Sequence, residues 1–168
     1  MLLMKPCETY LLLAMKNIFF FVVLFFIGTA TLSADEINKT TAAQTGKITV
    51  HIIELKHLKG MLGVSLYNSK KGFPGKHEQA YTSELKKISG TTETVVFEDL
   101  PYGSYAVSIM HDENNNGKLD TNFIGIPKEG VGVSNNPKIG MGGPKFNDSV
   151  FTLDTKELEV TVEMKYFK

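Results

Sequence analysis

The chain has 168 residues and a formal charge of zero, with 18 basic residues against 18 acidic ones. All 18 basic residues are lysine, which excludes bidentate arginine clamps for phosphate or carboxylate. The balanced charge also lacks the basic excess typical of nucleic-acid binding, so nucleic acid is not expected as a partner. The single cysteine, Cys7, excludes a disulfide framework and a thiolate zinc site.

Residues 1–34 have the three parts of a secretory signal peptide. Lys16 precedes an unbroken run of ten apolar residues, 18–27, and small residues follow as far as Ala34. A helix of that length spans about 15 Å, half the apolar thickness of a bilayer, so we expect no permanent membrane span. A start at Met15 and an uncleaved anchor are the alternatives. The sequence thus predicts export to the periplasm or the exterior.

Cleavage could follow Ala30 or Ala34, and cleavage after Ala34 would leave 134 residues (168 − 34) with 16 lysines, 17 acidic residues and no cysteine. An exported chain without cysteine must obtain its stability from a packed core rather than from cross-links. Residues 35–46 are small and polar and are expected to form a flexible leader. Residues 47–168 are then expected to form a single folded domain.

Most of this domain alternates between apolar and polar residues with a period of two, which is typical of half-buried β-strands. Short strands separated by turn signals predict an all-β fold, an antiparallel Greek-key β-sandwich of the immunoglobulin-like or prealbumin-like kind with about seven strands. One segment, 79–88, has the composition of a short helix instead. The clearest strands are expected at 47–55, 60–67, 91–97, 105–110, 149–153 and 158–167.

Residues 100–105 (LPYGSY) join two of these strands. The pattern is similar to a turn found in prealbumin-like and surface-adhesin B-type sandwich domains. Tyr105 can bury its ring there and return its hydroxyl to the backbone, as in a tyrosine corner. The alternative is an ordinary hairpin, and either role is architectural.

Residues 111–120 carry oxygen side chains at alternate positions, in the pattern D-x-N-x-N-G-x-x-D. Ca²⁺ takes six to eight oxygen ligands, and EF-hand-type loops supply them at this spacing with glycine at position six. Position twelve is Phe123 rather than the usual bidentate glutamate, so the affinity should be modest. The predicted Ca²⁺ ligands are Asp112, Asn114, Asn116 and Asp120 through their side chains and Lys118 through its backbone carbonyl.

The same loop also fits a simpler interpretation. Asn116-Gly117 is a favoured hairpin turn, and asparagine and aspartate side chains stabilise turns by bonding their own backbone. Glu129 can join an ion site only if the chain folds back. The connection from 125 to 143 contains six glycines, and a connection of this length is either functional or a flexible loop.

The run from His111 to Asn135 (HDENNNGKLDTNFIGIPKEGVGVSN), continuing to GGPKFNDSVF, resembles the signature of an exported bacterial family catalogued as domain of unknown function 2141. The resemblance covers about 47–167 and implies a β-sandwich outside the cytoplasm with no established activity. Val131 and Val133 stand where aromatic residues are common, and Gly143-Pro144 stands where Pro-Pro is common. The positions that match are His111, Asp112, Asn114, Asn116, Gly117, Lys118, Leu119, Asp120, Asn122, Gly125, Pro127, Glu129, Gly132, Ser134 and Asn135.

Enzymes of similar architecture need residues that this chain lacks. A ureide hydrolase of prealbumin-like fold uses arginine-bearing motifs, and an iron dioxygenase needs paired Tyr and His ligands, a spacing that the four histidines do not show. His111 and Asp112 are neighbours on a strand, so their side chains should point to opposite faces and form no dyad. No catalytic residue is assigned from the sequence.

We therefore expect a secreted or periplasmic binding or accessory module. Its loop would be ordered by Ca²⁺ and would present a surface to a glycan, a peptide or an envelope component. One alternative is a hydrolase that uses His111, Asp120 and Glu129 in the same loop. Another is a purely structural envelope protein, and the oligomeric state is left open.

Overall fold

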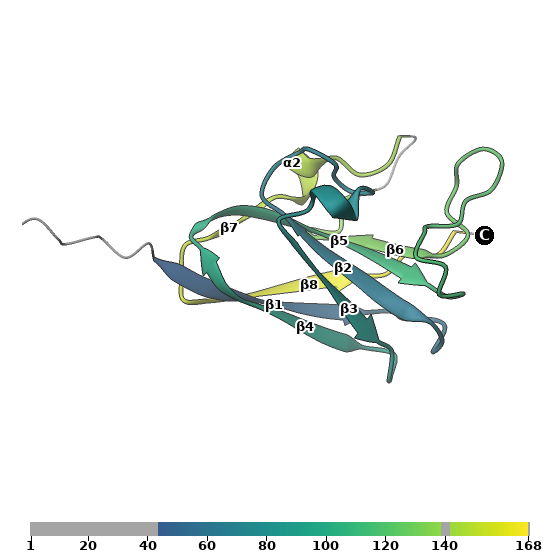
Figure 1. The fold of residues 1–168 in the computed structure, drawn as a ribbon, viewed down its shortest axis with the longest axis horizontal. Helices are drawn as coiled ribbons and strands as arrows, with labels where there is room; N and C mark the ends of the chain where they lie inside the picture. The colour runs from purple at the N-terminus through teal and green to yellow at the C-terminus, as the bar shows by residue number, and fades with distance from the viewer. Residues whose placement is uncertain (1–43, 139–141, 168) are drawn as a thin grey trace, which may run out of the picture. The chain divides into compact units, whose positions relative to one another are not determined.

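The structure, a computed structural model, describes residues 44–138 and 142–167, which form two β-sheets facing each other across an apolar core (Figure 1). The expected signal peptide, 1–34, and most of the expected leader lie outside the described residues. The first strand begins at Thr45, slightly before the predicted boundary at residue 47. In the part of the chain that the structure describes, no helix has the length and apolar character needed to cross a bilayer.

One sheet has three strands in the order β4-β1-β8, and the other has the order β3-β2-β5-β6, with β7 also paired to β5. This arrangement confirms the all-β sandwich. The strands are β1 (Thr45–Ile53), β2 (Met61–Tyr67), β3 (Thr82–Lys87), β4 (Glu93–Pro101), β5 (Gly103–Asp112), β6 (Gly130–Val133), β7 (Phe151–Leu153) and β8 (Glu157–Glu163). The short helical turns are η1 (His77–Gln79) and α2 (Phe146–Ser149).

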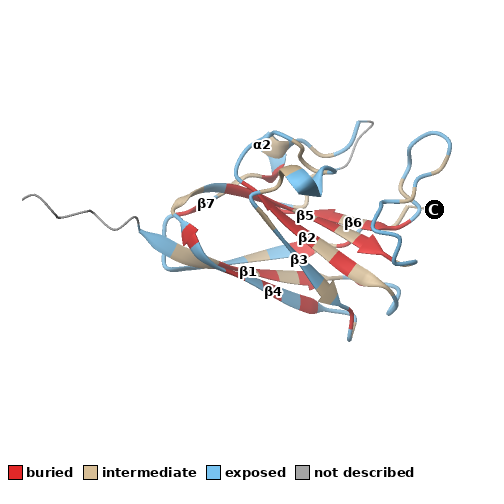
Figure 2. Ribbon diagram, viewed as in Figure 1, coloured by how far each residue is buried: buried red, intermediate tan, exposed pale blue. Residues whose placement is uncertain are grey.

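Alternate residues of the strands fill the space between the two sheets, as the buried positions in Figure 2 show. Ile48, Val50 and Ile52 of β1 are fully buried, as the period-two pattern predicts. Burying one such side chain fully contributes about 1.5–3 kcal/mol to folding. The core also contains Leu62, Val64, Leu66, Val107, Ile109 and Val162.

The segment 79–88 is not a helix. Its residues 82–87 form β3, which pairs antiparallel with β2 at the edge of the larger sheet. No residue of β3 is buried, and Leu85 is 75% exposed. An edge strand without a buried face shows no alternation of apolar and polar residues, so the periodic signal is absent.

β8 pairs with β1 in the parallel direction, unlike the antiparallel pairs that the sequence predicts. The chain reaches β8 from β7, which belongs to the other sheet. The direction of β8 is thus set by a crossover between sheets, and parallel neighbours need such a connection. The apolar alternation of β8 is the same in either direction, so it does not reveal the pairing.

Tyr105 forms the predicted tyrosine corner at the start of β5. Its ring is 3% exposed, and its hydroxyl donates a hydrogen bond of 2.7 Å to the Pro101 carbonyl. At the other end of β5, residues after β8 cross to the larger sheet, where Val131 and Lys165 exchange backbone hydrogen bonds of 3.0 and 2.8 Å. This crossing brings the C-terminal segment beside the end of β5.

Candidate functional site

The connection between β5 and β6, residues 113–129, is named here the β5–β6 loop. In Figure 1 it extends beyond the ends of the strands, and in Figure 2 most of it is exposed. It begins immediately after His111 and Asp112, both of which are buried. The loop therefore starts from a fixed point of the core, extends into solvent and returns to the buried Glu129.

Asp112 holds the first turn of the loop. Its Oδ1 accepts the Asn116 N–H at 3.1 Å, and its Oδ2 accepts the Gly117 N–H at 2.7 Å. Gly117 has a φ of 73°, in the left-handed region that glycine adopts without strain. These contacts are the aspartate-stabilised turn of the simpler interpretation.

The other predicted ion ligands converge on Asp120. Asn114 Nδ2 and Asn116 Nδ2 both donate to Asp120 Oδ2, at 2.6 and 3.2 Å. The amide oxygens of Asn114 and Asn116 accept the backbone N–H groups of Asn116 (3.1 Å) and Lys118 (2.8 Å). The structure thus brings the four side chains together, whereas Lys118 joins them through its N–H.

The described residues hold no group of three or more His, Cys, Asp or Glu side chains placed to bind a metal ion. The predicted Ca²⁺ ligands include two carboxylates and two amide side chains, so they differ in composition from such a group. In the structure these carboxylate and amide oxygens accept hydrogen bonds within the loop. Ion binding would have to compete with those bonds or use their remaining lone pairs.

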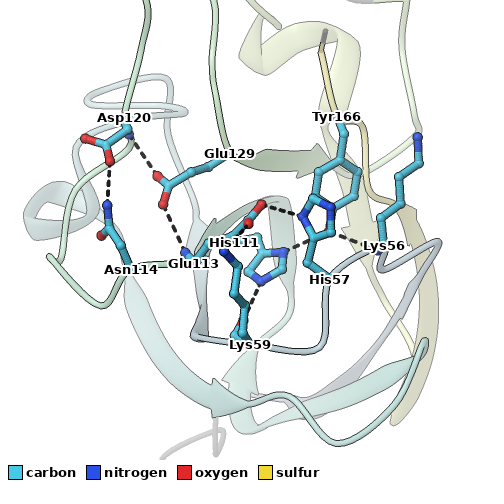
Figure 3. A network of polar contacts seen from close by, with 9 residues as sticks. All are labelled: Lys56, His57, Lys59, His111, Glu113, Asn114, Asp120, Glu129 and Tyr166. Atoms are coloured by element: carbon cyan, nitrogen blue, oxygen red, sulfur yellow. Dashed lines mark hydrogen bonds and ion pairs between the residues drawn. The ribbon is translucent and has the colours of Figure 1, made fainter.

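Glu129 folds back into the loop and braces it from inside. Its side chain is 5% exposed, and its two oxygens accept the N–H groups of Glu113 and Asp120, each at 2.9 Å (Figure 3). A buried carboxylate is stable only with such partners. Glu129 therefore ties the beginning of the loop to its middle.

Residues 120–128 form a small hairpin at the end of the loop, named here the tip hairpin. Thr121 and Pro127 form an antiparallel bridge, and the Lys128 N–H donates to the Asp120 carbonyl at 2.8 Å. At its turn, Asn122 Oδ1 accepts the N–H groups of residues 124 and 126, at 3.0 and 2.9 Å. The turn is thus held by hydrogen bonds although it has no apolar core.

Four large apolar side chains are exposed on the tip hairpin or immediately before it, and we name them the apolar tip. Phe123 is 98% exposed and Ile124 is 64% exposed. Ile126 and Leu119 are less exposed, at 37% and 36%. Elsewhere in the described residues, large exposed apolar side chains are separated in the sequence, at Leu58, Tyr81, Leu85 and Val96.

His111 lies under the loop and is fully buried. Its Nε2 is 2.8 Å from the Lys59 carbonyl, which can only accept, so Nε2 carries the proton (Figure 3). Its Nδ1 then accepts from the Tyr166 hydroxyl at 2.8 Å. Burial raises the pKa of Tyr166 above 10.0, which keeps this hydroxyl protonated as a donor.

A charged cluster lies beside His111 and Tyr166. Glu113 contacts His57 Nδ1 at 2.9 Å and Lys59 Nζ at 3.3 Å. Burial raises the pKa of the Glu113 carboxyl, but the hydrogen bonds from His57 and Lys59 outweigh it, so its pKa lies below the ordinary 4.5. The cluster connects the β1–β2 turn to the beginning of the loop.

This geometry gives little support to the hydrolase alternative. His111 is fully buried and both of its ring nitrogens are hydrogen-bonded, so it cannot reach a substrate. Glu129 contacts backbone N–H groups with both of its oxygens. The three residues of the alternative thus act as internal supports in the structure.

Other positions of the motif also support the fold. Ser134 Oγ accepts the Val107 N–H at 2.9 Å and donates to the Ser149 carbonyl at 2.5 Å. Asn135 Nδ2 donates to the Val150 carbonyl at 2.9 Å. Val133 is 5% exposed, so at this position the side chain packs in the interior.

An open groove lies beside Tyr166. Lys56 and Lys165 line it together with Glu54 and Glu163, and Lys165 Nζ lies 2.6 Å from Glu163 Oε2. Lys138 lines the groove as well, so three lysines face two glutamates there, without an acid–base pair poised for chemistry. The β5–β6 loop therefore remains the better candidate.

Sequence reasoning missed the partners of His111 and the apolar tip. Lys59 and Tyr166 are 52 and 55 residues away from His111 in the chain, and nothing local marks them as its partners. The tip had a visible signal in the letters NFIGIP, which place three large apolar residues inside a polar loop.

A comparison with known protein families gives one match. Residues 50–161 match the model of the family described as "Uncharacterized protein conserved in bacteria (DUF2141)". The matched range covers all or part of every strand and the whole β5–β6 loop. Comparisons with curated proteins and with solved structures found no match.

Proposed function

This chain belongs to the uncharacterised bacterial family DUF2141, and we propose that it is an exported binding module whose β5–β6 loop docks onto the bacterial cell envelope. The expected signal peptide and the sandwich fold support the exported module. The apolar tip supports the docking role. The sandwich then serves as the rigid base that holds the loop.

The observation that carries this proposal is the exposure of the apolar tip on a braced backbone. Isolated apolar residues at a surface are ordinary, but several large ones gathered together mark interaction sites. Phe123 and Ile124 are adjacent in the chain and both more than half exposed. A loop that packed down as a purely structural element would bury them.

The bracing of the loop supports the same proposal. Asp112, Asn122 and Glu129 fix its backbone through hydrogen bonds that leave the apolar side chains of the tip free. A loop already held in one conformation loses less conformational entropy when it binds. The polar residues of the motif therefore prepare the tip for contact.

A sedimentation experiment with isolated bacterial envelopes tests the proposal. The chain 35–168 is suitable because its core and its described hydrogen bonds lie within the compact unit Ala42–Lys168. We expect wild type to sediment with the envelopes and the double variant Phe123→Ser/Ile124→Ser to stay in solution. Its free energy of unfolding should change by no more than about 0.5 kcal/mol, since both side chains are exposed.

The matched control is Leu85→Ser, which removes an equally apolar, 75% exposed side chain from β3 outside the loop. This variant should sediment like wild type. Equal sedimentation of wild type and the tip variant, or equal loss in the control, would contradict a docking role for the loop.

Ca²⁺ binding by the loop is a second candidate function. It is favoured by the convergence of Asn114, Asn116 and Asp120, joined by contacts of 2.6 and 3.2 Å, at the spacing of a known ion-binding pattern. Asp112 is linked to this group through the Asn116 N–H. An ion held there would add to the internal bracing of the same loop.

A further inference from the structure

We infer that the apolar tip inserts into the surface of an anionic lipid bilayer. The inference rests on the proposed docking function and specifies that the loop docks onto lipid. It is drawn from the shape and exposure of the tip, from the hydrogen bonding of its backbone and from the charges beside it.

Four of the five backbone N–H groups at residues 122–126, all but that of Phe123, have acceptors within the tip hairpin. In an apolar environment each unpaired N–H group is costly, so a segment that enters lipid must satisfy its own donors. The N–H groups of residues 122 and 125 donate to the carbonyls of Ile126 and Asn122, at 2.8 and 3.0 Å. Those of residues 124 and 126 donate to Asn122 Oδ1. The turn that carries Phe123 thus satisfies these four donors internally.

The exposed charged residues of the β5–β6 loop are lysines, and they favour anionic headgroups. Lys118 and Lys128 are exposed, and neither forms an ion pair with any described residue. The one acidic residue between them, Asp120, has its Oδ2 bonded to the amides of Asn114 and Asn116. Lysines at the edge of an inserted apolar segment are attracted to an anionic membrane surface.

The size of the tip favours a lipid surface over a protein partner. A specific protein interface commonly uses roughly 20 to 30 residues on each side. The tip hairpin spans only residues 120–128, and its apolar side chains protrude rather than line a groove. A few inserted side chains are sufficient for reversible attachment to a bilayer when lysines add electrostatic attraction.

The absence of tryptophan from the chain allows a direct test with Phe123→Trp in the chain 35–168. Its single tryptophan, excited selectively over the tyrosines, reports the environment of the tip. We expect its emission to shift to the blue with vesicles of phosphatidylcholine and phosphatidylglycerol, and not with phosphatidylcholine alone. Lys118→Gln/Lys128→Gln in the same background should weaken partitioning roughly ten-fold or more at low salt. Leu85→Trp is the matched control and should show no shift.

The outcomes separate this inference from the proposed function. Sedimentation with envelopes but no blue shift with either vesicle would overturn lipid insertion and leave docking to a protein or glycan. Failure in both assays would overturn both proposals. An equal shift with both vesicles would overturn the requirement for anionic lipid. Circular dichroism checks that each variant is folded. Sedimentation of the wild-type chain with the same vesicles tests binding to anionic lipid without the Phe123→Trp substitution.

Discussion

At the scale of single residues, the side chains of the β5–β6 loop replace the secondary structure that the loop lacks. Buried or crowded backbone N–H groups need acceptors, and in a loop no neighbouring strand provides them. Asp112, Asn122 and Glu129 each accept two backbone N–H groups. The abundance of aspartate, asparagine and glutamate in the motif therefore has a structural explanation that requires no ion.

At the same scale, we predict that these residues also bind Ca²⁺. After treatment with a chelator, titration of the chain 35–168 with Ca²⁺ should give heat, with a dissociation constant on the order of 10⁻⁴–10⁻³ M. A Ca²⁺ concentration of ten times that constant should stabilise the fold by about 1.4 kcal/mol. Asp120→Asn should abolish both effects.

Asp154→Asn serves as the control for this titration, because Asp154 is exposed and lies outside the loop. This variant should give the same heat of Ca²⁺ binding and the same stabilisation by Ca²⁺ as wild type. If calorimetry gives no heat and the thermal midpoint is the same with Ca²⁺ and with chelator, the loop is held by its hydrogen bonds alone.

At the scale of elements, β6 and the C-terminal segment decide how His111 is covered. Gly130 pairs with His111 across the β5–β6 ladder, and a Cβ atom at Gly130 would lie 2.5 Å from the Tyr166 ring. A Cβ atom at Gly132 would likewise lie 2.8 Å from Val162 Cγ1. These glycines let the chain after β8 approach β6 closely, so Tyr166 can reach His111.

We therefore expect Gly130→Ala to destabilise the fold by about 1–3 kcal/mol, because the added methyl group displaces the Tyr166 ring from a packed position. Unfolding in urea measures the change. Hydrogen exchange of the Lys56 amide, whose N–H donates to the Tyr166 hydroxyl at 3.4 Å, reports the displacement itself.

Gly63→Ala is the matched control on β2, where an added Cβ would meet its nearest atom at an ordinary 3.8 Å. There the change in stability should stay within about 1 kcal/mol and should not alter exchange at Lys56. Equal effects of the two substitutions would show that Tyr166 is not held by close packing against Gly130.

At the scale of the whole molecule, stability depends on pH through a buried carboxylate at the β3–β4 turn. Glu93 is 7% exposed and accepts hydrogen bonds from Ser89 and Gly90, with Lys86 nearby. Burial raises the pKa of Glu93, but the hydrogen bonds and the Lys86 charge outweigh it and hold the pKa below 4.5. The unfolded chain consequently binds more protons than the folded chain in acid.

The stability contributed by Glu93 is thus fully present above about pH 4.5 and is lost as the pH falls through its lower folded value. We expect the free energy of unfolding in urea to decrease between about pH 5 and about pH 3. Glu93→Gln should be less stable by about 1–3 kcal/mol at neutral pH but should decrease less steeply in acid. Glu98→Gln, at an exposed position on the same strand, should keep the slope of wild type. Identical slopes in all three proteins would contradict the role of Glu93.

The sequence by itself determined the strands whose alternate residues face a core and the tyrosine corner. These features depend on neighbours within a few residues, and local periodicity reports them. The connection expected at 125–143 was wrong in part, because strand β6 (Gly130–Val133) lies within it. Only the tertiary structure decided that 82–87 is an edge strand and that β8 runs parallel to β1. It also decided that Glu129 folds inward and that Tyr166, 55 residues away, covers His111. The physical reason is that pairing between distant segments depends on packing and hydrogen bonding across the whole fold, which no local pattern records.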